Sequence, residues 1–143
     1  MPETQPAGDT PAPPRPRLID RLPLPNGLTL EVVDESRVAA GDRWFVRVRF
    51  RAEIPVTPEI FERAAVPGVT YADYTAHRGG AVVYEALKER TFLDAGEKDA
   101  AVAEIVARFK AHSLAYVAHP DFPVGVVRND IRDFEERRRW GRS

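Results

Sequence analysis

The stretch "RWFVRVRFRAEI", residues 43–54, places an apolar side chain at every second position. Successive side chains of a β-strand point to opposite faces of the sheet, so this alternation predicts a strand. One face would lie against a core and consists of Trp44, Val46, Val48, Phe50, Ala52 and Ile54. The other face carries Arg43, Phe45, Arg47, Arg49, Arg51 and Glu53. The first face decides the fold, and the second raises the functional question.

Two further strands are predicted around this one. The stretch "NGLTLEVVDESR" alternates in the same way and predicts a strand over 28–33. The loop 34–42 leaves no room for a crossover helix, so the two strands should form an antiparallel hairpin. Residues 81–94, "AVVYEALKERTFLD", fit a strand or a helix by periodicity. We favour a third strand, because the segment follows Gly-Gly and has β-branched or aromatic residues at both ends.

The remaining elements are predicted as helices and one loop. Thr57 and Pro58 are typical of a helix start, and 69–80 is predicted as a tyrosine-rich loop. Asp94 with Glu97 resembles a capping box for a helix that ends before Pro120. A final helix follows with an apolar stripe. The predicted fold class is α+β, a small antiparallel sheet of about three strands covered on one face by one or two C-terminal helices.

The two ends of the chain differ in composition from the middle. Residues 1–17 contain six of the thirteen prolines, and no large apolar residue follows Met1. Such a segment cannot bury enough surface to offset its ordering entropy, so it is predicted to be a disordered arm. Residues 18–136 are predicted to form a single α+β domain, and 137–143 an arginine-rich C-terminal tail.

Composition limits the classes of function. Hydrophobic residues make up 43% and charged residues 30%, which is typical of a soluble globular protein. With a formal net charge of −1, no overall field attracts the protein to nucleic acid or a membrane. The chain has no cysteine, no apolar run approaching the ~20 residues of a membrane span, and no secretory signal pattern. We therefore expect a soluble, cytoplasmic protein.

No pattern of catalytic or metal-binding residues is present. None of the serines lies in a Gly-x-Ser-x-Gly turn, and no glycine-rich phosphate loop occurs. His112 and His119 are seven residues apart, which on one helix is ~10 Å along the axis and too far to share a metal. We assign no catalytic residue, no metal ligand and no cofactor, although an enzyme with its site in 71–80 stays an alternative.

The arginine face has two interpretations. Arg47, Arg49 and Arg51 are spaced ~7 Å apart and could meet successive phosphates, while Phe45 could stack on a base. Alternatively, Glu31, Glu85 and Glu89 would face outward on the neighbouring strands and neutralise the row. We expect this glutamate–arginine ladder.

Two short segments, "RLIDR" (17–21) and "VVDESRVAAG" (32–41), together resemble the sequence pattern of the PilZ family. In that family an Arg-x-x-x-Arg arm and an Asp/Asn-x-Ser-x-x-Gly turn bind cyclic di-GMP on an antiparallel barrel. The resemblance implies that Arg17, Arg21, Asp34 and Ser36 would contact the nucleotide. Ala39 stands where the pattern has glycine.

The C-terminal stretch "ERRRWGRS" places Arg137, Arg138 and Arg139 beside Trp140. Such cations complement the end of a helix dipole, and they could also grip an acidic partner or RNA. Taken together, the sequence indicates a small non-enzymatic interaction module whose partner is another protein. The alternative is a nucleic-acid or cyclic-dinucleotide binder that uses the arginine face and the C-terminal arginines. Oligomeric state is left open.

Overall fold

The computed structural model describes residues 16–142, so most of the expected N-terminal arm and Ser143 lie outside the described residues. The strands are β1 (Arg17–Pro23), β2 (Thr29–Asp34), β3 (Arg37–Val38), β4 (Trp44–Pro55) and β5 (Ala81–Leu93). The helices are α1 (Pro58–Ala64), α2 (Tyr71–Arg78), α3 (Lys98–His112), α4 (Leu114–Val117) and α5 (Phe122–Arg142). The α+β class is confirmed.

The sheet is antiparallel and has β4 at its centre. β2 pairs with one side of β4 and β5 with the other, which confirms the hairpin and the third strand. β1 pairs with β2 outside this trio, and the short β3 pairs with the first residues of β4. The sheet thus has five strands rather than about three. β1 was missed because a register shift between Leu18 and Asp20 interrupts its alternation.

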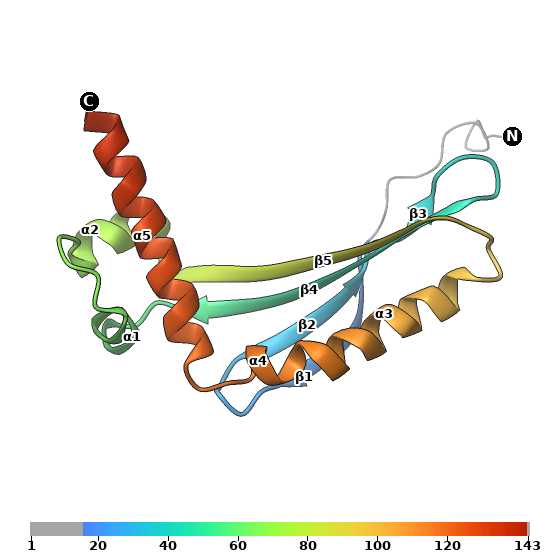
Figure 1. The fold of residues 1–143 in the computed structure, drawn as a ribbon, viewed down its shortest axis with the longest axis horizontal. Helices are drawn as coiled ribbons and strands as arrows, with labels where there is room; N and C mark the ends of the chain where they lie inside the picture. The colour runs from blue at the N-terminus through green and yellow to red at the C-terminus, as the bar shows by residue number, and fades with distance from the viewer. Residues whose placement is uncertain (1–15, 143) are drawn as a thin grey trace, which may run out of the picture.

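Helix α3 covers the apolar face of the sheet, as Figure 1 shows. The apolar residues of β4 from Val46 to Ile54 are buried on this face. The Phe50 ring stacks on the Phe109 ring of α3, with centroids 3.8 Å apart. Buried apolar area of this kind stabilises by about 25 cal/mol per Å², so this layer holds the fold together.

The predicted loop 69–80 is wrong over most of its length, because residues 71–78 form helix α2. The Thr70 side chain caps the helix by accepting a hydrogen bond from the Asp73 amide at 3.1 Å. Tyr74 is fully buried and lies against the Phe61 and Phe134 rings. Packing of one aromatic ring therefore outweighs the weak helix propensity of the segment.

Both predicted bounds of the next helix are also corrected. The Asp94 amide donates to the Glu97 carboxylate at 3.1 Å, as a capping box predicts, but residues 95–97 form a turn and α3 itself begins at Lys98. The helix stops at His112, and after Ser113 the short α4 follows instead of a continuous helix to Pro120.

Helix α5 crosses one end of the sheet beside α1 and α2 (Figure 1). It continues to Arg142, so the expected C-terminal tail is helical through that residue. Arg128 donates to the Ala64 carbonyl of α1 at 3.0 Å, and Arg78 of α2 binds Asp130 through two 2.8 Å hydrogen bonds. None of the helices within residues 16–142 has the length and apolar character that crossing a membrane requires.

Candidate functional site

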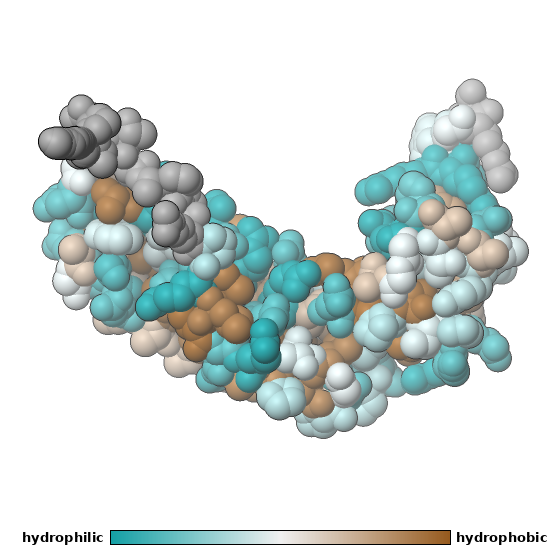
Figure 2. Space-filling model, turned by 180° about the vertical axis from the view of Figure 1, so that it is seen from behind, coloured by the Kyte–Doolittle hydropathy of each residue, from teal (hydrophilic) through white to brown (hydrophobic). Residues whose placement is uncertain are grey.

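The arginine face of β4 lies opposite α3 and is not covered by a helix. Figure 2 shows the molecule hollowed between its two ends, above the middle of the sheet. The strand register places Arg51 between Glu31 and Glu85, and Arg47 beside Glu89. These are the positions at which a glutamate–arginine ladder would form.

The ladder is present and confirms the expectation. Arg47 binds Glu89 at 2.8 Å, and Arg51 contacts Glu31 at 3.3 Å. Arg21 of β1 also reaches Glu31, at 3.0 Å. Cross-strand ion pairs of this kind contribute only ~0.2–1 kcal/mol each, but they neutralise the cations that a phosphate would need.

Arg49 is held most firmly of the three. Its guanidinium binds the two Glu35 oxygens at 2.7 and 3.1 Å and contacts Glu85 at 3.1 Å. The hydrogen bond to Glu35 is the main reason that the pKa of Arg49 is raised. Glu35 was expected only as a loop residue, and its role in the ladder was missed because the loop folds back beside β4.

Phe45 is not an open stacking platform. The guanidinium of Arg37 lies 5.1 Å from the ring centroid and that of Arg47 lies 5.3 Å from it. These distances are typical of cation–π contacts, so the ring already has two cationic neighbours.

The residues of the PilZ resemblance are likewise paired within the protein. Arg17 binds Asp34 at 3.2 Å, and Ser36 donates its amide to Asp34 at 2.9 Å. Burial would raise the pKa of Asp34, but the hydrogen bonds from Ser36 and Arg17 outweigh burial and lower the pKa. Among the described residues the sheet is open, with β1 and β5 at its edges, and is not the barrel that the resemblance implies.

The C-terminal arginines point in different directions on α5. Arg138 is turned inward, since it contacts Glu135 at 2.5 Å and Asp73 at 3.5 Å and donates to the Gly68 carbonyl at 2.9 Å. Arg139 is 77% exposed and only approaches Glu135, at 3.8 Å. The four predicted residues 137–140 therefore do not form a single basic binding surface.

Trp140 lies on another side of the same helix. It lines a hollow with Val66 and Pro67, and the same lining contains two arginines and two glutamates, Arg132, Arg139, Glu135 and Glu136. Arg137 lines a separate hollow with His77 and Phe134. The first hollow has equal numbers of arginines and glutamates in its lining. In the second hollow, Arg138 is paired with Asp73 and Glu135.

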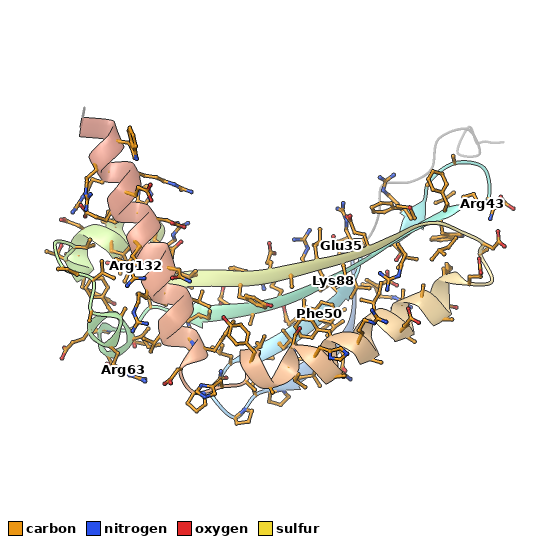
Figure 3. The ribbon with its side chains drawn as sticks, viewed as in Figure 1. Glu35, Arg43, Phe50, Arg63, Lys88 and Arg132 are labelled. Atoms are coloured by element: carbon orange, nitrogen blue, oxygen red, sulfur yellow. The ribbon has the colours of Figure 1, made fainter. Side chains whose placement is uncertain are left out.

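A third hollow differs from these and was not predicted. It runs between the edge strand β5 and helix α3 and has a volume of about 320 Å³. We call it the β5–α3 groove, and it is lined by Lys88, Arg90, Ile105, Arg108, Phe109, His112 and Ser113. In Figure 3, Lys88 lies in the middle of β5, above α3 and near Phe50.

The groove contains basic side chains and no carboxylate among its lining residues. Arg90 has two weak partners outside the lining, the Glu89 carbonyl at 3.2 Å and the Glu104 carboxylate at 3.5 Å. The side chains of Lys88, Arg108 and His112 make no hydrogen bond or ion pair with any of residues 16–142. His112 lies in the last turn of α3, where basic residues are common, but this position does not account for Lys88, Arg90 and Arg108.

The sequence contained a signal for this groove. On β5 the parity that faces the core starts with Val82, Tyr84 and Ala86 and then changes to Lys88 and Arg90. On α3, Arg108 and His112 are four residues apart, next to the buried Ile105 and Phe109. Cations at core-facing positions of a strand are uncommon and mark the place where the core gives way to a surface site.

Within residues 16–142, no group of three or more His, Cys, Asp or Glu side chains is arranged to hold a metal ion. Comparisons with known proteins found no matching family model, no matching curated protein and no matching solved structure.

Proposed function

We propose that the protein is a non-enzymatic interaction module that binds an acidic, extended segment of a partner protein in the β5–α3 groove. The observation that carries the proposal is the unbalanced charge of this groove. Lys88, Arg90, Arg108 and His112 face it, while its lining holds no carboxylate. A carboxylate-rich segment would supply the missing partners, and charge complementarity of this kind gives specificity and fast association.

The floor of the groove supports the same proposal. Ile105 and Phe109 lie between the basic side chains and are buried against the sheet. Because Ile105 and Phe109 are only 3% and 4% exposed, they form a packed floor that holds the basic side chains in place, and ion pairs rather than apolar contact would supply the affinity.

A peptide fits the groove better than a single-stranded nucleic acid. Such strands gain much of their affinity from stacking bases on exposed aromatic rings. Phe109 is only 4% exposed, and Phe45 on the other face already has two guanidinium groups near its ring. Arg47, Arg49 and Arg51 are also paired with glutamates. We further propose the cytoplasm as the compartment, because a chain without cysteine needs no oxidising environment.

The test is a fluorescence anisotropy titration with a labelled peptide of glutamate and threonine. We expect Lys88→Glu with Arg108→Glu to weaken binding at least about tenfold, because each substitution sets like charges against the peptide. The matched control is Arg132→Glu with Arg137→Glu on α5. This variant changes the net charge equally and should bind like the unaltered protein.

Two outcomes would overturn the proposal. Equal loss of affinity in both double variants would mean that only net charge matters. Tighter binding of a single-stranded RNA of the same length, lost in the Lys88→Glu and Arg108→Glu variant, would favour the nucleic-acid alternative.

A further inference from the structure

We infer that the partner segment binds as an added strand at the β5 edge, with acidic residues at alternate positions. The inference rests on the proposed function, because it takes the β5–α3 groove as the binding site. It adds the backbone geometry and the sequence pattern of the segment.

The first observation is that β5 is an edge strand. It pairs with β4 over most of its length, and within residues 16–142 no other strand pairs with its second side. Alternate backbone N–H and C=O groups of such a strand point away from the sheet and can bond an incoming chain. Strand addition to an exposed edge is a recurrent way of recognising extended peptides.

The open part of this edge has definite limits. At its start, Val82 is buried and Tyr84 packs edge-on against Phe122 of α5, with ring centroids 5.1 Å apart. The pairing with β4 stays in regular register up to Arg90 and then shifts. Phe92 beyond the shift has a positive φ of 59°, a bulge-like conformation that ends regular strand geometry. Residues 85–90 are therefore the stretch to which a strand can be added.

The side chains of this stretch set the pattern of the ligand. Lys88 and Arg90 share the parity that faces α3, whereas Glu85, Leu87 and Glu89 face the opposite side. An added strand lies ~4.8 Å away, with every second side chain on the α3 side. Those side chains would meet Lys88 and Arg90 across the strands and approach Arg108 and His112 from the helix. Carboxylates are favoured at these alternate positions and not at the positions between them.

The same cations explain why the edge does not pair indiscriminately. Inward-facing charges on an edge strand discourage pairing with apolar strands, because a bare cation would be buried. An acidic strand removes this penalty, so selectivity arises from repulsion of the wrong partners as well as attraction of the right one.

Two contacts of Arg90 would be exchanged on binding. The Arg90 guanidinium donates to the Glu89 carbonyl at 3.2 Å and lies 3.5 Å from Glu104. Both are long, exposed contacts of low energy, so a carboxylate on an incoming strand can replace them.

The experiment uses seven-residue peptides of threonine and glutamate with the full-length protein, read by fluorescence anisotropy. The parent peptide alternates the two residues, and an isomer of equal composition has its glutamates contiguous. Two further versions of the parent carry N-methyl groups, one on all its glutamates and the other on all its threonines. N-methylation removes backbone donors on one edge of the peptide strand and leaves the other edge intact.

The inference predicts that one N-methylated version binds like the parent and the other at least about tenfold more weakly, since only one edge of the peptide faces β5. The contiguous isomer should also bind several-fold more weakly than the alternating peptide. Binding that depends on Lys88 and Arg108 but is insensitive to both changes would overturn strand addition and leave the proposed function standing. Failure of every peptide to bind would overturn both.

Discussion

The arginine face of β4 and the β5–α3 groove are both rich in cations, but their surroundings differ. On the arginine face, Arg47, Arg49 and Arg51 each contact a glutamate within 3.3 Å. In the groove, Lys88 and Arg108 have no such partner among the described residues. The contrast teaches that pairing, rather than the number of cations, separates a structural surface from a candidate site.

The largest expected effect is a loss of folding stability on changing Phe50, which lies on the core face of β4 and packs against α3. Phe50→Ala removes the ring that stacks on Phe109 and should lower the free energy of unfolding by about 3–5 kcal/mol. Chemical denaturation would measure the loss. Phe50→Leu, which keeps most of the buried volume, is the control and should lose much less. A small loss in Phe50→Ala would show that α3 is not held to the sheet by this contact.

Substitutions on the arginine face should lower folding stability and leave peptide affinity unchanged. Arg49→Ala leaves Glu35 without its bidentate partner in a largely buried setting and should cost ~2 kcal/mol of folding stability. Arg51→Ala is the matched control and should cost less, because Glu31 keeps its contact with Arg21. Loss of peptide affinity in either variant, at unchanged fold, would contradict the assigned structural role.

Substitutions in the groove should lower peptide affinity and leave folding stability nearly unchanged. Arg108→Gln keeps helix propensity and breaks no ion pair, so its stability should change by less than ~0.5 kcal/mol. Its affinity for the glutamate–threonine peptide should fall about three- to fivefold, through the loss of one charge contact. Thermal denaturation measures the stability of this variant, and the anisotropy titration measures its affinity. A destabilised variant with normal affinity would reverse the assignment.

The smallest expected effect is a change in the stability of the protein at low pH. Because the pKa of Asp34 is lowered in the folded protein, its contribution to stability is complete above its ordinary value of 3.8 and is lost as pH falls through the folded value. Asp34→Asn should therefore reduce the loss of stability on acidification below about pH 4, because the substitution removes the carboxylate that Ser36 and Arg17 stabilise. Unfolding curves measured at pH 6 and pH 3 would reveal it. An unchanged acid response would mean that the hydrogen bonds from Ser36 and Arg17 to Asp34 do not contribute to stability.

The sequence predicted those parts of the molecule in which a local pattern and the core agree. The alternation of residues 43–54 identified β4, its core face and the ladder with Glu31, Glu85 and Glu89. Helix α2 was missed because its stability comes from burying Tyr74 rather than from local propensity. The groove was missed because Lys88 and Arg108 are far apart in the chain, and only the tertiary fold shows that neither meets a carboxylate.

The most direct test of the central claim is to locate the bound peptide. We propose a titration of ¹⁵N-labelled protein with the alternating glutamate–threonine peptide, followed by amide chemical shifts. We expect the largest changes in residues 85–90 of β5 and in the part of α3 around Arg108 and His112. Changes centred on Arg47, Arg49 and Arg51, with the groove unaffected, would contradict it.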